Sequence, residues 1–292
     1  MRPSQFVKEP ATIEAQLLKL EHRGCIIEDR THAKTVLEKI NYYRLANYFA
    51  IFQENSKRYR AGTSFNKVVR IYDFDRRLRG CLLIYLEEIE VSMRAIISNF
   101  HALKYGALGY LNDSTFSHHH QHNHFLSRVE RLTEKNTDLN FVNHYNRKHS
   151  GAFPLWVMME LFSFGMLAHF FRSLHKQDKK EIVDKHFDGR FSASHLDSWL
   201  DSMAALRNLC AHYSRLYASR LEPAPRAIED LPFKMGGDLF SFIYVIRMLY
   251  IRRAGGESNL SITLGALFEE FGEIIDLGVL GFPEGWEEIL GG

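Results

Sequence analysis

Three polar side chains within six residues carry the clearest potential for chemistry in this chain. Arg207, Asn208 and His212 lie in the stretch RNLCAH, which continues directly into YSRLY. Cleavage of RNA by its own 2′-hydroxyl needs a base, a cation on the nonbridging oxygens and an acid for the leaving 5′ oxygen. Histidine titrates near neutral pH, and arginine stays charged and grips phosphate with two N–H groups. The stretch is a candidate active site, the alternative being residues that merely cap and pair a helix end.

The spacing of these residues raises a geometric question. Residues 196–206 repeat apolar side chains at helical spacing and predict a helix that leads into the motif. At ~100° per residue Asn208 and His212 share a face, whereas Arg207 lies roughly 140° from His212. Either the helix ends or distorts there, or the long arginine wraps round, or a second copy of the chain completes the site.

A second arginine and histidine are spaced to lie on one helix face. Arg94 and His101 are seven residues apart, so they fall within roughly 20° of each other, two turns apart. Glu90 precedes Arg94 by four residues, a spacing that favours an ion pair. One interpretation is a structural Glu90–Arg94 pair beside a surface His101. The other is a second arginine–histidine pair that faces the first.

Further side chains could contact RNA. Arg44 is polar within the aromatic-rich segment 40–52, whose tyrosines and phenylalanines could stack bases but at helical spacing are more often core. Tyr213 and Arg215 follow the motif directly and are also candidate RNA contacts. Five histidines lie within residues 118–124, but no acidic partners or helical HExxH spacing accompany them, so we predict a solvated loop and no metal site.

Composition indicates an ordinary soluble globular protein that works in a reducing compartment. The 292 residues carry a formal net charge of +2, which excludes a strongly basic nucleic-acid coat but allows a local basic site. Cys25, Cys81 and Cys210 are far apart, odd in number and lack CxxC spacing. The first residues show no signal peptide, and no apolar run reaches the ~18–20 residues of a membrane span. We therefore expect a cytoplasmic protein without a membrane segment.

The pattern of apolar residues predicts an all-α fold. No convincing alternating strand and no glycine-rich phosphate loop after a strand is present. A long central helix is expected from Ser64 to about Gly106, and a continuous helix from Leu155 to Leu167 after Pro154. A last helix is expected over 262–275, followed by a mobile glycine-rich tail. Three segments forming one compact unit are expected, over 1–64, 65–222 and 223–292.

Several blocks of the sequence resemble a known family. Residues 40–45, INYYRL, resemble a block of bacterial abortive-infection (Abi, AbiD/AbiF-like) proteins. Residues 73–79 with 88–94 resemble their central helix, and residues 153–157 with Phe164-Gly165 resemble their PxWV…FG block. Arg207, Asn208 and His212 match the R-x(4–6)-H signature of the HEPN superfamily of helical ribonucleases. The blocks occur in the family's order and cover about residues 5–220.

The resemblance implies a HEPN-like helical bundle with additional N- and C-terminal helices, in an anti-phage or toxin–antitoxin system. HEPN ribonucleases need no metal or other cofactor and usually build a composite site across a dimer. We therefore expect an RNA substrate, a homodimer, and a small-RNA or protein antitoxin as a further partner. Arg94 and His101 fit an R-x6-H form of the motif but lack the following asparagine.

Three functions are consistent with these features. The first is a metal-independent RNA endonuclease that acts as an abortive-infection toxin, in which Arg207 holds the scissile phosphate, His212 serves as acid or base, and Asn208 orients one of them. The second is a non-catalytic helical module that binds RNA or protein within a defence complex. The third is a helical scaffold whose histidine loop binds a metal.

Overall fold

The computed structural model describes residues 9–250 and 259–291, and within these ranges it contains thirteen α-helices and no β-strand. The all-α prediction is confirmed. The helices, in chain order, are α1 (Ile13–His22), α2 (Arg30–Lys39), α3 (Tyr42–Phe49), α4 (Phe65–Tyr105), α5 (His122–Lys135), α6 (Asn140–Lys148), α7 (Leu155–Met158), α8 (Phe164–Ser173), α9 (Lys176–Phe187), α10 (Ala193–Ala211), α11 (Leu239–Leu249), α12 (Leu260–Phe271) and α13 (Trp286–Gly291). None of the described helices is long and apolar enough to cross a membrane.

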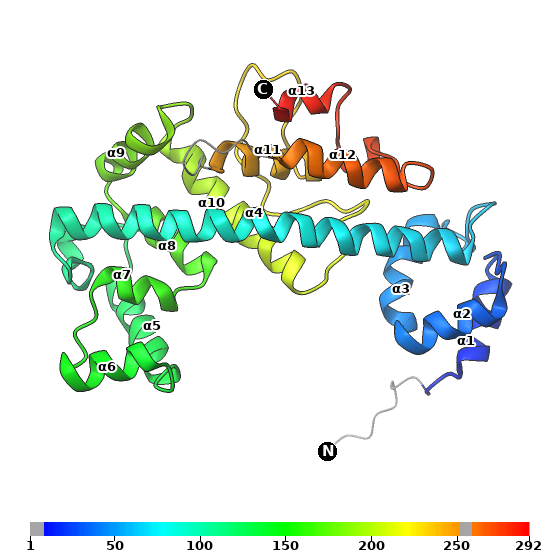
Figure 1. The fold of residues 1–292 in the computed structure, drawn as a ribbon, viewed down its shortest axis with the longest axis horizontal. Helices are drawn as coiled ribbons and strands as arrows, with labels where there is room; N and C mark the ends of the chain where they lie inside the picture. The colour runs from blue at the N-terminus through cyan, green and yellow to red at the C-terminus, as the bar shows by residue number, and fades with distance from the viewer. Residues whose placement is uncertain (1–8, 251–258, 292) are drawn as a thin grey trace.

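Helix α4 runs the length of the molecule and organises the other helices (Figure 1). Its 41 residues correspond to ~60 Å of helix. The helix starts where the Ser64 hydroxyl accepts a hydrogen bond from the Lys67 backbone N–H, and it ends at Gly106, whose φ of 88° few other residues adopt. Both limits agree with the sequence prediction.

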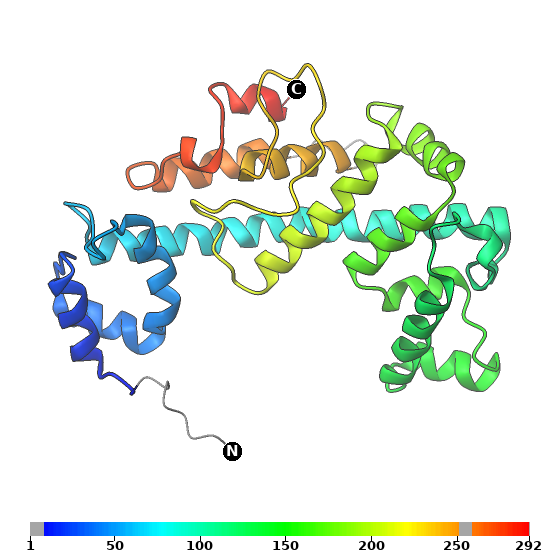
Figure 2. The ribbon, with the colours of Figure 1, turned by 180° about the vertical axis from the view of Figure 1, so that it is seen from behind.

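Four helices, α8, α10, α11 and α12, pack directly against α4. Helices α11 and α12 lie along one side of α4 and α8 lies toward the other, whereas α10 crosses α4 obliquely and contacts both α8 and α11 (Figures 1 and 2). The contact surface is a row of aliphatic side chains spaced three or four residues apart, all of them buried: Leu78, Leu82, Leu86, Ile89, Met93 and Ile97. Burying each of these side chains contributes ~1.5–3 kcal/mol, so α4 is the core of the fold.

The N-terminal helices form a small lobe at the beginning of α4. Each is capped by a short polar side chain: Thr12 for α1, Asp29 for α2 and Asn41 for α3. Leu45, Tyr48 and Phe49 of α3 are buried, and α3 packs directly against α4. The lobe therefore places the aromatic-rich segment beside the central helix.

The predicted continuous helix from Leu155 to Leu167 is wrong. Helix α7 is followed by a 3₁₀ turn, η4 (Met159–Leu161), then by Phe162 in extended conformation and by a new helix that Ser163 caps through the Met166 N–H. Apolar periodicity continues through the interruption because both helices bury the same kind of face. The break matters for the site because it frees backbone carbonyls for side-chain partners.

The prediction of a mobile C-terminal tail is also wrong. After α12 the chain makes a 3₁₀ turn, η5 (Gly278–Leu280), and the short helix α13. Phe282 and Trp286 are buried, and both rings pack against Phe268 of α12. Aromatic burial fixes this segment despite its glycines. The last predicted helix, over 262–275, corresponds to α12, which begins at Leu260 and ends earlier, at Phe271.

Candidate active site

Helix α10 presents the motif at its C-terminal end. Its start is fixed by Ser192, whose hydroxyl lies 2.7 Å from Nδ1 of His195, and Leu196, Trp199 and Leu200 anchor its buried face. The helix continues through Ala211, and His212 is the C-cap, with its backbone N–H donating to the Asn208 carbonyl over 2.9 Å. The chain is thus helical from Arg207 to the cap, and the angular offset of roughly 140° between Arg207 and His212 persists.

Arg207 and Arg94 meet on one carboxylate. Glu90 of α4 pairs with Arg94 on its own helix, and its second oxygen lies 3.2 Å from Nη2 and 3.3 Å from Nε of Arg207. Glu90 is 9% exposed and Arg207 33% exposed, so the carboxylate is buried and the Arg207 guanidinium still reaches solvent. Asn208 accepts a hydrogen bond from Nη1 of Arg207 over 3.1 Å and orients it. Two cations share one anion here, which leaves the cluster net positive.

Arg94 is held by the break between α7 and α8. Its Nη2 donates to the Phe162 carbonyl over 2.6 Å, and its Nη1 donates to the Glu160 carbonyl over 3.3 Å. Its Nε is buried without a hydrogen-bond partner among the described residues. The predicted Glu90–Arg94 pair is present, and the pair extends into a network that joins α4, α10 and η4. We call Glu90, Arg94, Arg207 and Asn208 the arginine cluster.

His101 does not join the arginine cluster. It is completely buried and packs against Tyr105, Phe116 and Phe170, with ring centroids 4.9–5.5 Å apart. Neither ring nitrogen has a hydrogen-bond partner within the described residues, and burial lowers the pKa of His101 to about 4. The interpretation of His101 as a surface residue is therefore wrong. Its aromatic surroundings are those of a core residue.

His212 lies apart from the arginine cluster. It lines a pocket of about 400 Å³ together with residues from α3. Arg44 donates from Nη1 to the Tyr213 carbonyl over 2.9 Å, and its guanidinium lies 5.8 Å from the centre of the Tyr213 ring. Arg215 donates to the Asn47 carbonyl over 2.6 Å. The structure therefore brings His212 together with the three predicted RNA contacts, Arg44, Tyr213 and Arg215. We call this hollow the His212 pocket.

The aromatic-rich segment divides between the core and the pocket. Tyr48 and Phe49 are buried as core residues, whereas Tyr43 is 80% exposed and lines the His212 pocket. The imidazole of His212 is exposed and makes no hydrogen bond or ion pair within the described part of the chain. An accessible imidazole beside two guanidinium groups and an exposed tyrosine ring can bind a nucleotide and exchange a proton with it.

A buried network fixes the chain after the motif, and sequence reasoning did not assign it a role. The Asp75 carboxylate of α4 accepts hydrogen bonds from the backbone N–H groups of Leu216 and Tyr217, from the Tyr48 hydroxyl and from Arg79, all at 2.8–2.9 Å. Arg79 also donates to the Ser214 carbonyl. Burial raises the pKa of the Asp75 carboxyl, and its hydrogen bonds and Arg79 act in the opposite direction. In the sequence, the i,i+4 spacing of Asp75 and Arg79 was the signal that could have predicted this ion pair.

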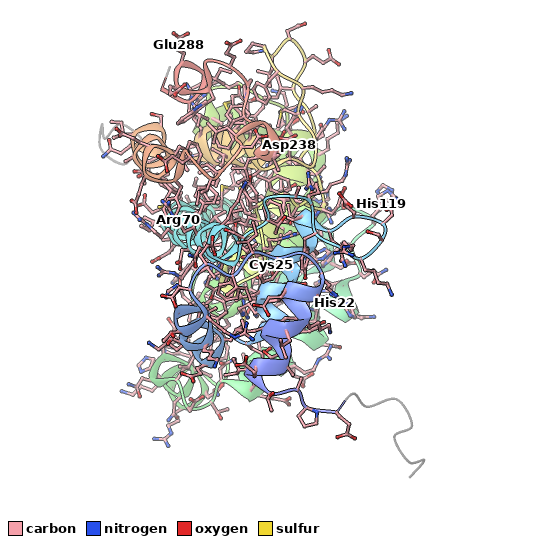
Figure 3. All side chains as sticks on the ribbon, turned by 90° about the vertical axis from the view of Figure 1, so that its right-hand side faces the viewer. His22, Cys25, Arg70, His119, Asp238 and Glu288 are labelled. Atoms are coloured by element: carbon pink, nitrogen blue, oxygen red, sulfur yellow. The ribbon has the colours of Figure 1, made fainter. Side chains whose placement is uncertain are left out.

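The histidines of residues 118–124 are not arranged as a metal centre. His120 stacks on Phe116 at 4.1 Å, and His118 lies against His119. In Figure 3, which looks along α4, His119 is at the outer edge of the molecule. Across 9–250 and 259–291, no three His, Cys, Asp or Glu side chains are grouped so that they could hold a metal ion.

Comparison with known protein families identifies the family of this chain. The model of the family described as Abi-like protein matches residues 35–218. This range extends from α2 through the arginine cluster to the residues that Asp75 holds. The chain therefore belongs to the Abi-like protein family. No curated protein and no solved structure matches the chain.

Proposed function

We propose that this Abi-like protein is a metal-independent RNA endonuclease that acts in the cytoplasm as an abortive-infection effector. The observation that carries the proposal is the end of α10, where Arg207, Asn208 and His212 are all accessible and two further arginines, Arg94 and Arg44, converge on them from α4 and α3. Membership of the Abi-like family supports the defence role. The HEPN-type chemistry rests on the residues of the motif.

The chemistry follows from the groups that each part of the site supplies. The Arg207 guanidinium would hold the nonbridging oxygens of the scissile phosphate, with Asn208 and Glu90 fixing its orientation. The His212 imidazole would accept the 2′-hydroxyl proton or protonate the leaving 5′ oxygen. Attack of the 2′ oxygen on phosphorus breaks the bond to the 5′ oxygen, leaving a 2′,3′-cyclic phosphate and a 5′-hydroxyl.

A homodimer would resolve the separation of Arg207 and His212. Within one chain the Arg207 side chain contacts α4, whereas His212 lines a pocket with α3. A two-fold symmetric pair can place Arg207 of one copy opposite His212 of the other. The symmetry then forms the same Arg207–His212 contact twice, once in each of two sites. We therefore propose a composite site formed by two copies of the chain.

Cleavage of RNA by the purified full-length protein in EDTA tests this function. We expect the wild type to cut a single-stranded RNA, and Arg207→Ala or His212→Ala to reduce the rate at least ~100-fold, the scale of losing one transition-state contact. Arg220→Ala is the matched control, because Arg220 is exposed, pairs among the described residues only with nearby Glu222, and lies outside both parts of the site. Absence of cleavage, or cleavage that persists in both site variants, would refute the proposal.

One observation favours the second candidate function, a non-catalytic module. Glu90 already neutralises one edge of the Arg207 guanidinium, so the cluster could act as an anion clamp without turnover. In that case a small RNA or a protein antitoxin would copurify with the protein and stay intact. Growth arrest on induction that disappears in His212→Ala would favour the endonuclease instead.

A further inference from the structure

Helix α5 carries two arginines, a lysine and a histidine in a row on a single face. His124, Arg128, Arg131 and Lys135 follow one another at i, i+4, i+7 and i+11, which places them within roughly 60° around the helix axis. The acidic residues of the same helix, Glu130 and Glu134, lie about 90° or more from the centre of this row. We call the four residues the α5 stripe. Like charges at this spacing repel, so the stripe costs stability unless an anion covers it.

No carboxylate within the described residues pairs with the α5 stripe. The only hydrogen bond by a cationic group of the stripe runs from Nε of Arg131 to the Ser127 carbonyl of its own helix, over 3.0 Å. Two lysines of α9 behave differently. Lys180 pairs with Asp184, and Lys179 lies 3.3 Å from Asp197. The α5 stripe thus presents positive charge to solvent without a carboxylate partner in the described part of the chain.

The stripe is one wall of a groove of about 540 Å³. The opposite wall is formed by Leu161, Ser163 and Met166, at the break between α7 and α8. In Figure 1, α5 lies below α7, the helix that leads directly into η4. The groove therefore combines a row of positive charge with a partly apolar wall, a combination that suits a nucleic-acid strand.

The groove adjoins the arginine cluster through three consecutive residues. Leu161 and Ser163 line the groove, while the carbonyl of the intervening Phe162 accepts the 2.6 Å hydrogen bond from Arg94. One short segment thus separates the cations of α5 from Arg94 and its partner Glu90. A polyanion lying along the stripe would be led toward the cluster.

We propose that the α5 stripe binds the sugar–phosphate backbone of single-stranded RNA beside the arginine cluster. This inference rests on the proposed function for the identity of the strand. The stripe is ~16 Å long, enough for a few consecutive phosphates, and its two arginines offer the forked N–H groups that phosphate accepts. Leu161 and Met166 on the opposite wall provide apolar surface for ribose and base.

Binding of a labelled, fully 2′-O-methylated oligoribonucleotide to the full-length protein tests the inference. This probe cannot be cut through a 2′-hydroxyl, so binding is measured apart from cleavage. For Arg128→Ala/Arg131→Ala we expect at least ~10-fold weaker binding at 0.1 M salt, and a slope of log K against log salt that is smaller by ~1.4, or ~0.7 per lost phosphate contact. Arg128→Lys/Arg131→Lys should retain most of the affinity.

Lys179→Ala/Lys180→Ala is the matched control, since those cations already pair with carboxylates, and its affinity should stay within ~2-fold of wild type. Unchanged affinity and salt slope in the arginine-to-alanine variant, with circular dichroism showing it folded, would overturn the inference. Tighter binding of poly-glutamate than of the oligonucleotide would overturn the assignment to RNA. Stripe-dependent binding without cleavage of unmodified RNA would refute the proposed function alone, whereas cleavage with stripe-independent binding would refute this inference alone.

Discussion

At the scale of single residues, Glu90 holds Arg94 and Arg207 in position and offsets the repulsion between them. It is a nearly buried carboxylate between two guanidinium groups, and removing its charge leaves Arg94 and Arg207 to repel each other. We expect Glu90→Gln to destabilise the fold by ~2 kcal/mol, less than for a fully buried pair because Arg207 is partly exposed. RNA cleavage should fall as well, since Arg207 loses its position.

Urea denaturation measures the stability change of Glu90→Gln. Glu88→Gln is the matched control on the same helix, because Glu88 makes no ion pair within the described chain. A Glu90→Gln protein as stable and as active as wild type would show that the carboxylate does not organise the cluster.

His101 makes stability depend on pH. Its pKa is about 4 in the folded protein, below the ordinary value near 6.5, because burial disfavours the charged ring. Protons therefore bind the unfolded chain more readily than the folded one. The contribution of neutral His101 to folding stability is complete above pH 6.5 and is lost as the pH falls toward 4. The loss from this residue is on the order of 3 kcal/mol.

Denaturation midpoints at pH 7.5 and pH 4.5 check the prediction for His101. We expect His101→Phe, which keeps an aromatic ring against Phe116 and Phe170, to lose less stability over this range than the wild type. An equal loss in both proteins would show that the buried imidazole does not titrate as inferred.

At the scale of elements, Asp75 ties α4 to the chain that follows α10. Its carboxylate holds the N–H groups of Leu216 and Tyr217 and a buried Arg79. We expect Asp75→Asn to cost ~3 kcal/mol, because Arg79 is left buried without a full counter-charge. Hydrogen exchange at Leu216 and Tyr217 should become faster, and cleavage should weaken as the His212 pocket loosens.

Asp73→Asn provides the comparison for Asp75→Asn. Asp73 lies two residues earlier on α4, and its one ion pair within residues 9–250 and 259–291 is an exposed one with Arg76 at 3.5 Å. Its loss should therefore change stability by less than ~0.5 kcal/mol. Similar hydrogen exchange in the two variants would contradict the anchoring role of Asp75.

Local signals of helices were readable from the sequence, and tertiary partners were not. Ser64 starts α4 as expected, because a cap depends on neighbours three residues away. The break after α7 was missed, although Ser163 was a visible cap, because its extended carbonyls are satisfied by Arg94 from 66–68 residues earlier in the chain. Likewise, periodicity placed His101 on a face of α4 but could not show that aromatic residues of other elements cover it.

At the scale of the whole molecule, the site is divided between α4 on one side of the end of α10 and α3 on the other. The motif residues and the contacts Arg44, Tyr213 and Arg215 were identified from the sequence, but their grouping into two parts depends on how α3 and α10 meet α4. If two copies complete each other, mixing inactive Arg207→Ala and His212→Ala chains should restore activity, because each mixed dimer keeps one intact composite site.

Co-refolding of equal amounts of the two variants, followed by a cleavage assay, tests this expectation. Random pairing should return about a quarter of wild-type activity, since half the dimers are mixed and each has one of two sites. No recovery, with mixed dimers shown to be present, would place Arg207 and His212 of each site in one chain.

The central claim is that this protein cuts RNA through attack by the RNA's own 2′-hydroxyl. The most direct measurement is the chemical identity of the ends of the RNA fragments that the purified wild-type protein produces in EDTA. Fragments should carry a 2′,3′-cyclic phosphate or 3′-phosphate and a 5′-hydroxyl, and they should be absent with His212→Ala. Fragments with a 3′-hydroxyl and a 5′-phosphate, or no fragments at all, would contradict the claim.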